Sequence, residues 1–472
     1  MTFRIGRAAF MAFLAAVLLA PMAPVDTLAK QRPAKSANSG RGGDHGWNPG
    51  PRAERDREFG RDTGKGDFAD TCDVVLAGSC AGQVIVHFQA GYGPADVKVI
   101  ADANGAMDID WLYPRGLVLY RTSGNAAELA NQLAASPVVD WVERNTVDQQ
   151  PIGSPRIFTP RAYTSPAAVA DDALNSSTAL AAVKGREAAA CFNGAGVVVA
   201  VIDTGFSADG NELFQGGVTQ GFNAFTRTAD VQEGVDGSVK DAAGHGTHIA
   251  GIIRQIAPTS TIMPIKALDA DGQGQAFYLA VAMDYAIATG ADVINLSLGA
   301  RQPSKAVDMM IGIADQQGIV VVAAGGNDGN DTRSYPAAAD GGTLMGVAAT
   351  GLTDSATGLV NYQMLASYTS RYRELDLAAP GTDVISAFPV GLAGIDTGWA
   401  IWSGSSMATA WVSGAAADVI AKNQTIDGDA VVQQLKRTAT TLSGDTGNTD
   451  GKGGMQRRTM LDAGKAVCGA GR

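Results

Sequence analysis

The stretch Trp402-Ser403-Gly404-Ser405-Ser406-Met407-Ala408-Thr409 places small and hydroxyl residues directly before a long alanine-rich run, Ala410–Ala421. The run predicts a buried helix, and Gly404 lets the backbone turn tightly where that helix begins. At a helix start, unpaired N–H groups and the helix dipole favour negative charge. Ser406 is therefore either a helix cap or a nucleophile, and this stretch alone does not decide between the two.

Length and composition describe a globular enzyme. The 472 residues are enough for a large core and an additional module. The chain is 46% hydrophobic, has 59 Gly and contains few aromatic residues, which is typical of a compact, loop-rich protein. Its net charge of −11 argues against nucleic acid as a partner, because phosphate binding needs clustered Lys and Arg.

The N-terminus has the features of an export signal. Arg4 and Arg7 precede an apolar run, Ala8–Ala20, that is too short to span a bilayer comfortably. We expect residues 1–29 to be a cleaved signal peptide and the mature protein to be secreted, extracellular or periplasmic, without a membrane anchor. Residues 30–68 mix Gly, Pro, Arg, Asp and Ser without a period and predict a disordered spacer.

A small domain is predicted over residues 69–150. Its expected elements follow the β-α-β-β-α-β order of the ferredoxin-like split pattern, which on its own fits any binding module. The strands are expected at 83–88, 107–111, 117–121 and 138–142, and the helices at 95–103 and 126–135. From Asn145 onward the chain is rich in Pro, Ser, Ala and Thr. This composition predicts a linker, assigned to residues 151–177, where a precursor is open to cleavage.

The remainder, residues 178–472, is predicted to be an α/β domain with a doubly wound, mostly parallel sheet and helices on both faces. Its strands are continuous apolar runs, as expected when both faces of a parallel sheet are buried. They lie at 197–202, 262–267, 293–296, 319–324 and 344–348, with helices at 276–288 and 305–317 between them. In such sheets, ligands bind beyond the carboxyl ends of the strands.

Reactive side chains lie at these strand exits and at helix starts. Asp203 follows the first strand, and Asn327 follows the fourth. His245 lies in Gly244-His245-Gly246-Thr247-His248, where small residues open a helix, and the large domain has only these two His. Two His three apart suit zinc, but no H-E-x-x-H pattern or third ligand is evident. A single imidazole acting as a base fits better.

Together these residue types supply the parts of an acyl-transfer site. A serine hydroxyl becomes a good nucleophile when a base takes its proton, and imidazole titrates near neutrality. A buried carboxylate fixes the imidazole tautomer and stabilises the imidazolium. An amide donor then stabilises the oxyanion.

Four motifs, in this order and in these contexts, resemble the subtilisin-like serine proteases over roughly residues 178–421: those of Asp203, His245, Asn327 and Ser406. The order Asp, His, Ser separates that family from the α/β-hydrolases, whose order begins with serine. The resemblance implies that Asp203 orients the base His245 and that Ser406 is the nucleophile. It also implies that the Asn327 side chain and the Ser406 backbone N–H form the oxyanion hole. The expected activity is that of a secreted endopeptidase that hydrolyses proteins or peptides through an acyl-enzyme.

The resemblance extends to the walls of a substrate cleft. Leu268–Gly274 resembles the edge segment that pairs with an extended substrate, and Asn295–Ala300 resembles the opposite wall. Both imply β-augmentation, in which main-chain hydrogen bonds hold a peptide with little regard to its sequence; plain loop glycine is the alternative for both. Ser334-Tyr335-Pro336 resembles the floor of the first specificity pocket, where the family often has a cis Tyr-Pro bond. The expected substrate-binding residues are Gly272, Gln273, Gly274, Ser297, Leu298 and Gly299.

The small domain also resembles part of this family. Val138–Glu143 is similar to the last strand of the family's inhibitory propeptide. This implies a self-processing, monomeric zymogen whose small domain is an intramolecular inhibitor and folding chaperone, cut near Gln150 or further along the linker. Two alternatives are a catalytically inactive, peptide-binding pseudoprotease and an adhesion module. The complete triad argues against the first, and the lack of repeats argues against the second.

The chain departs from the family pattern in two places. Ala410 and Trp411 stand where the family usually has Pro and His, which predicts altered packing without loss of activity. The helix after His245 has no room for the usual calcium-binding loop, since His248 runs through Arg254 to Ala257-Pro258 without interruption. We therefore predict no cofactor and no metal site, with calcium still possible at loop acids.

Four cysteines allow three pairings and support export. We favour Cys72–Cys80 and Cys191–Cys468, because cleavage in the linker then separates no linked pieces. The second bridge would tie a C-terminal helix, expected near 455–467, to the start of the large domain.

Overall fold

The computed structural model describes residues 75–76, 79–113, 115–146, 150–151, 177–208, 211–233, 242–392, 398–443 and 459–469. All of these residues belong to one compact unit of the chain. The predicted signal peptide, the spacer, most of the linker and Cys72 lie outside them. Among the described residues, no helix combines the length and the apolar character that a membrane span requires.

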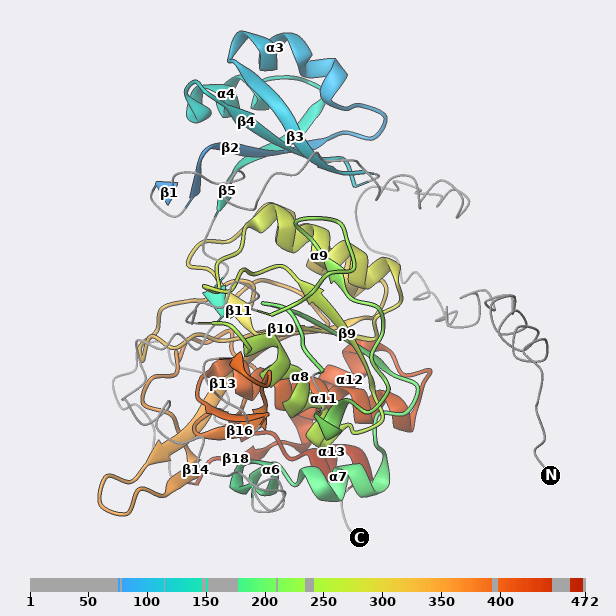
Figure 1. The fold of residues 1–472 in the computed structure, drawn as a ribbon, viewed down its shortest axis with the longest axis vertical. Coiled ribbons are helices and arrows are strands. Elements are labelled where there is room, and N and C mark those ends of the chain that lie inside the picture. The colour runs from blue at the N-terminus through green and yellow to red at the C-terminus, as the bar shows by residue number, and fades with distance from the viewer. Residues whose placement is uncertain are drawn as a thin grey trace, which may run out of the picture. The chain divides into compact units, whose positions relative to one another are not determined.

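The small domain is a five-stranded antiparallel sheet with two α-helices, α3 and α4, on one face (Figure 1). β2 lies between β4 and β5, and β3 pairs with the other side of β4. The predicted β-α-β-β-α-β order is confirmed, with one short strand added before it. The elements are β1 (Val75–Leu76), β2 (Ser79–Phe88), η3 (Pro94–Val97), α3 (Lys98–Ala103), β3 (Ala106–Leu112), β4 (Leu117–Thr122), α4 (Ala126–Ala134) and β5 (Val139–Thr146).

The predicted start of the linker-like stretch, at Asn145, is wrong. This residue lies in β5, which continues through Thr146. Its side chain is buried, and its amide nitrogen donates to the side-chain oxygens of Gln83 and Gln275, at 2.7 Å each. Composition misplaced the boundary because polar residues such as Asn145 are held here by partners from other segments.

The large domain is built on a ten-stranded sheet in the order β18-β19-β15-β13-β12-β10-β7-β9-β8, with β14 antiparallel to β13. All neighbouring pairs from β19 to β8 are parallel, so the predicted mostly parallel sheet is confirmed. Its strands are β7 (Val198–Asp203), β8 (Phe222–Asn223), β9 (Thr261–Lys266), β10 (Val293–Leu296), β12 (Val320–Ala324), β13 (Leu344–Thr353), β14 (Val360–Leu365), β15 (Leu377–Pro380), β18 (Thr440–Thr441) and β19 (Thr459–Met460). Two short ribbons pair β6 (Gln150–Pro151) with β11 (Leu298–Gly299), and β16 (Val384–Ala387) with β17 (Trp399–Trp402).

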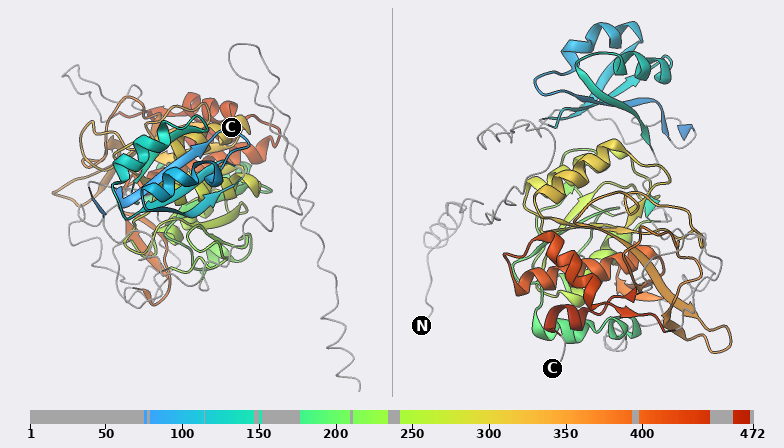
Figure 2. Two further views of the ribbon diagram at one scale, coloured as in Figure 1. Left: turned by 90° about the horizontal axis from the view of Figure 1, so that it is seen from above. Right: turned by 180° about the vertical axis from the view of Figure 1, so that it is seen from behind.

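Helices cover both faces of this sheet. Along β7, Val199 and Val201 pack into one core with α8 and α11, whereas Ala200 and Ile202 pack into a second core with α9 and α10. Figures 1 and 2 show α9 across the sheet from α8 and α11. The domain is therefore doubly wound, as predicted. Its helices are α6 (Thr178–Ala182), α7 (Gly185–Cys191), η6 (Glu212–Phe214), α8 (His245–Ile256), α9 (Ala276–Ala288), α10 (Lys305–Gln316), α11 (Ser405–Lys422), α12 (Gly428–Thr438) and α13 (Ala463–Cys468).

The C-terminal helix is shorter than predicted. α13 begins at Ala463, because the Asp462 side chain caps it by accepting a hydrogen bond from Lys465 N at 2.9 Å. Thr459–Met460 forms strand β19 instead of helix. The structure contains the favoured Cys191–Cys468 disulfide, with Cα atoms 5.7 Å apart, and it joins α13 to α7. The Cys72–Cys80 pairing lies outside the described side chains.

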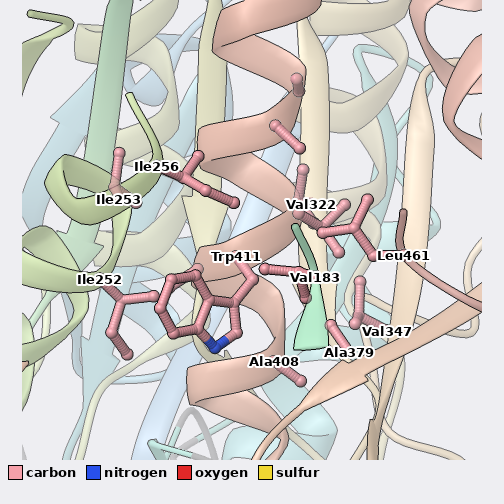
Figure 3. Close-up of a cluster of buried hydrophobic side chains, with 14 of the residues drawn as sticks. Val183, Ile252, Ile253, Ile256, Val322, Val347, Ala379, Ala408, Trp411 and Leu461 are labelled. Atoms are coloured by element: carbon pink, nitrogen blue, oxygen red, sulfur yellow. The ribbon is translucent and has the colours of Figure 1, made fainter. Parts of the chain in front are cut away.

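Helices α8 and α11 cross at close range around Trp411. The indole is fully buried and lies beside Ile252 of α8 (Figure 3). A Cβ atom at Gly414 would lie 2.4 Å from Ile256 Cγ2 and 3.2 Å from Ile253 O, so only glycine fits at this crossing. The two helix starts are thereby held at the same edge of the sheet, which is where the reactive side chains lie.

Candidate active site

Three strand exits meet at one edge of the sheet. β7, β10 and β12 are neighbours and run parallel, so their carboxyl ends lie side by side. Asp203 is the last residue of β7, Ser297 follows β10, and Asn327 lies three residues beyond β12. The strand order alone brings these three residues to one rim of the domain.

Two helices begin at the same rim. His245 is the first residue of α8, and Ser406 is the second residue of α11. α8 can start beside the turn after Asp203 only because residue 246 is glycine. A Cβ atom there would lie 2.2 Å from the carbonyl oxygen of Gly205.

His245 and Asp203 form a buried hydrogen-bonded pair. His245 Nδ1 lies 2.7 Å from Asp203 Oδ1, and both side chains are 0% exposed. Asp203 Oδ1 also accepts a hydrogen bond from Thr204 N at 2.8 Å. His245 Nε2 is buried and has no hydrogen-bond partner among the described residues. The imidazole is thus oriented from one side, with its second nitrogen available for chemistry.

The Trp402 ring links this pair to the segment that precedes Ser406. Its ring centroid lies 5.3 Å from that of His245, with the two planes at 87°. The same indole packs against His248 at 5.8 Å. Burial lowers the pKa of His248 to about 3, and its Nε2 lies 3.2 Å from the carbonyl oxygens of both Val384 and Ala400. His248 therefore stays neutral and supports packing.

Ser406 is held against the wall formed by Ser297. Ser406 Oγ donates to Ser297 O at 2.9 Å, and Ser297 Oγ donates to Ser406 O at 2.9 Å. Asn295 Nδ2 donates to Ser297 Oγ at 3.0 Å and its Oδ1 accepts from Ser413 Oγ at 2.9 Å. In this arrangement the Ser406 hydroxyl points to a backbone carbonyl and not to the imidazole.

Asn327 lies beside the start of α11. Its Oδ1 accepts a hydrogen bond from Ser405 N at 3.0 Å. This contact orients the amide, because it leaves Nδ2 as the donating group of the side chain. The Ser405 hydroxyl in turn accepts from Gly326 N at 3.1 Å. An amide donor is thus fixed one residue from Ser406.

The two predicted walls differ in the structure. Leu298–Gly299 pairs antiparallel with Gln150–Pro151, so this wall already holds an extended segment of the chain. The other wall forms a tight turn in which Asp269 Oδ1 accepts from Gln273 N at 2.8 Å, with Gly272 at φ 79°. No strand partner is found for Gly272–Gly274 among the described residues. The substrate-binding role of this second wall stays a prediction.

The predicted floor segment lies next to the paired wall. The backbones of Ala300 and Tyr335 exchange two hydrogen bonds of 2.8 Å. The Tyr335-Pro336 peptide bond is cis, as the resemblance suggested.

Side chains of β5 cap two helices of the large domain. The Glu143 carboxylate accepts from Lys305 N at 2.7 Å, from Ala306 N at 3.1 Å and from the Ser304 hydroxyl at 2.8 Å, all at the start of α10. Asn145 Oδ1 accepts from Phe277 N at 3.2 Å, at the start of α9. Residues 143 and 145 lie two apart on one strand and so face the same side. The small domain thereby docks on the helices that flank the paired wall.

One further residue at this rim was missed from the sequence. The Glu233 carboxylate is buried and contacts both the turn after Asp203 and the start of α8. It lies in a polar loop without a period, so no sequence signal marks it. Within the described ranges, no group of three or more His, Cys, Asp or Glu side chains is arranged to hold a metal ion. The expectation that there is no metal site, with calcium possible at loop acids, stays a prediction.

Comparisons with known proteins point to one family. The sequence profile of the subtilase family matches residues 194–456. Subtilisin BL and Subtilisin Savinase, both from Lederbergia lenta, are each 35% identical to this chain over 260 residues, which is 53% of this chain and 86% of each relative.

The fold has a counterpart among solved structures. The crystal structure of fervidolysin from Fervidobacterium pennivorans, a keratinolytic enzyme related to subtilisin, matches with a TM-score of 0.66 and 20% identity. The match covers 84% of this chain and 62% of fervidolysin, so this chain spans less than two thirds of that protein. At this identity the likeness bears on the fold alone.

Proposed function

The chain belongs to the subtilase family of serine endopeptidases, and from this premise we propose that Asp203, His245 and Ser406 are its catalytic triad. The observation that carries the proposal is the 2.7 Å contact between His245 Nδ1 and Asp203 Oδ1, with both side chains fully buried. A carboxylate in that position holds the proton on Nδ1 and leaves Nε2 as the base.

Acylation follows from these positions. Rotation of the Ser406 side chain moves Oγ from Ser297 O toward His245 Nε2, which takes the hydroxyl proton as Oγ attacks the carbonyl carbon of the substrate. The imidazolium, stabilised by Asp203, then gives this proton to the leaving amine. Water, activated by the same base, hydrolyses the acyl-enzyme and restores Ser406.

The oxyanion of the tetrahedral intermediate needs preorganised donors. We assign this role to Asn327 Nδ2 and the Ser406 backbone N–H. Support comes from the contact between Asn327 Oδ1 and Ser405 N, which fixes the amide before substrate binds. Donors that are already oriented stabilise the developing charge without reorganisation.

The same proposal covers the substrate and the zymogen. Main-chain pairing of Leu298–Gly299 with Gln150–Pro151 supports binding of extended protein segments with little sequence selectivity. It also supports a small domain that inhibits the enzyme until it is cut off, because the end of that domain occupies this wall. Glu143 and Asn145 add the caps that hold it in place.

The register of this ribbon indicates where self-cleavage takes place. Leu298 pairs with Pro151 and Gly299 with Gln150, so the pairing of the described residues runs toward Ser297 and ends at Pro151. Ser297 O is the group that Ser406 Oγ contacts. We therefore expect the mature N-terminus within a few residues after Pro151. A mature N-terminus upstream of Gln150 contradicts this register.

Export completes the proposal. The charged and apolar pattern of residues 1–29 predicts a signal peptide, and the Cys191–Cys468 disulfide suits an oxidising compartment. The enzyme is then made as a secreted, self-processing precursor.

The test compares processing in pure preparations. Ser406→Ala is expected to stay full-length by intact mass, whereas wild type yields a shorter mature form. Ser403→Ala removes a nearby hydroxyl that contacts Asp383 and is expected to mature like wild type. Maturation of pure Ser406→Ala sinks the proposal. A wild-type chain that binds peptides but never shortens would indicate a pseudoprotease.

A further inference from the structure

Glu233 makes an unusual set of contacts for a buried acid. Its Oε2 accepts from Thr204 Oγ1 at 3.0 Å and from Gly244 N at 2.8 Å. Its Oε1 accepts from Thr247 N at 3.0 Å and from Thr247 Oγ1 at 3.2 Å. Each carboxylate oxygen therefore receives two hydrogen bonds inside the protein.

The partners of these groups show that all four contacts are donated to Glu233. Thr204 Oγ1 accepts from Gly246 N at 3.0 Å, and Thr247 Oγ1 accepts from Ser207 N at 3.0 Å. Each hydroxyl is thus already an acceptor, and its own hydrogen points to the carboxylate. The two amides and the two hydroxyls all direct a hydrogen at the carboxylate, an arrangement that suits the ionised form.

Charges around Glu233 act in both directions. Burial raises the pKa of the Glu233 carboxyl and nearby Asp203 adds to this, whereas Lys266 and the amides of Gly244 and Thr247 lower it. Lys266 Nζ also donates to Thr204 O, on the same turn. The carboxylate and the ammonium group thereby neutralise each other beside Asp203.

The place of Glu233 in the chain gives these contacts a consequence. α8 begins at His245 after Gly244, which has no side chain to cap the helix. The first N–H groups of a helix need acceptors, and Glu233 supplies them for Gly244 and Thr247, whereas Gly246 N donates to Thr204 Oγ1. Thr204 directly follows Asp203. The Glu233 carboxylate therefore joins Thr204 to Gly244 and Thr247, which lie on either side of His245 in the sequence.

We propose that Glu233 is a positioning residue of the peptidase reaction, which fixes the start of α8 against Thr204 so that His245 and Asp203 keep their contact. The inference rests on the triad proposed above. Glu233 touches neither His245 nor Ser406 in the described contacts and acts through its neighbours.

Two variants test the role by steady-state kinetics on a chromogenic peptide. Glu233→Ala removes all four contacts and is expected to lower kcat about 100-fold, because small misplacements of reacting groups have effects of that order. Glu233→Gln keeps one acceptor oxygen and is expected to lose about tenfold. KM is expected to stay within about twofold, since Glu233 lies on neither predicted cleft wall.

The split between kcat and KM separates positioning from general stability. In both variants kcat is expected to fall while KM stays near the wild-type value. Asp292→Asn is the matched control. Asp292 is also a buried acid, and it accepts from Val198 N at 2.9 Å at the opposite end of β7. Its loss is expected to lower stability without changing kcat.

A second measurement covers variants that fail to mature. In the full-length Ser406→Ala chain, the His245 Nδ1 proton is expected to give a downfield ¹H resonance from its bond to Asp203. Adding Glu233→Ala is expected to broaden or abolish this resonance, whereas adding Asp292→Asn preserves it. An unchanged resonance together with wild-type kcat in Glu233→Ala overturns this inference. Wild-type activity of Ser406→Ala would instead overturn the triad itself.

Discussion

A buried, unpaired acid in α11 gives the sharpest prediction on stability. Asp418 is fully buried, and neither carboxylate oxygen has a hydrogen-bond partner among the described residues. Burial raises the pKa of its carboxyl to about 9. The group is therefore protonated in the folded protein at neutral pH and ionised in the unfolded chain.

The direction and size of the effect follow from proton linkage. Between pH 4 and 9 the folded state binds one proton more than the unfolded state, so the free energy of unfolding falls as pH rises. With an ordinary value of 3.8, the loss is about 2 kcal/mol at pH 5 and about 6 kcal/mol at pH 8. Asp418→Asn cannot ionise and is expected to lack this loss. Its stability relative to wild type should therefore rise by about 4 kcal/mol from pH 5 to pH 8.

The assay is guanidinium unfolding of full-length chains that also carry Ser406→Ala, which prevents autolysis. Fluorescence of the large domain, which includes buried Trp411 on the same helix, reports its unfolding. The amide's own cost of burial is the same at every pH and cancels in the comparison between pH values. Asp331→Asn, which removes an exposed acid, controls for the change in net charge.

Parallel pH profiles of wild type and Asp418→Asn would refute the reasoning. They would mean that the carboxyl group ionises equally in both states and so has solvent or a cation beside it. An equal pH-dependent gain in Asp331→Asn would also refute it, since the effect would then come from overall charge.

Three further predictions concern stability and inhibition. Arg254→Met is expected to lower the free energy of unfolding by about 3 kcal/mol, because the buried Arg254 side chain donates to three backbone carbonyls. Unfolding in guanidinium chloride measures this loss. A chelator added to the wild-type protein should have no such effect. Desolvation, Glu143 and Asp340 raise the pKa of the Asp308 carboxyl to about 6. Because Glu143 comes from the small domain, docking of that domain favours the protonated form, and its inhibition constant should fall from pH 7 to pH 5. Asp308→Asn should flatten that dependence. Replacing both Cys191 and Cys468 by Ser removes a disulfide between residues 277 positions apart and should lower the free energy of unfolding by about 5 kcal/mol. Unfolding of this variant and of wild type under non-reducing conditions measures the difference.

The sheet and its reactive rim could be predicted from sequence because local patterns carry them. Continuous apolar runs identify parallel strands that are buried on both faces, and the ends of such strands are where ligand groups lie. Asp203 and Asn327 were found in this way. His245 and Ser406 were found because small residues mark the helix starts at which they lie. Their roles follow from the resemblance and remain proposals.

The errors have a common physical cause. Asn145 was placed in linker-like sequence because its partners, Gln83 and Gln275, come from other parts of the chain. The C-terminal helix was drawn too long because Thr459–Met460 joins the edge of the sheet, a pairing that local sequence does not encode. Composition describes what a segment prefers alone, whereas long-range hydrogen bonds decide what it forms.

Glu233 and Asp418 show why buried acids in particular escape sequence analysis. Both side chains are buried, and burial raises the pKa of both. Glu233 is met by four donors and lies near an ammonium group, and these contacts hold two segments of the rim together. Asp418 meets none among the described residues, so we expect the same chemical group to be neutral and to lower stability as pH rises. The difference lies entirely in the neighbours, which come from distant positions. A buried carboxylate with a complete set of donors is therefore a stronger sign of a role in the reaction than burial or a shifted pKa alone.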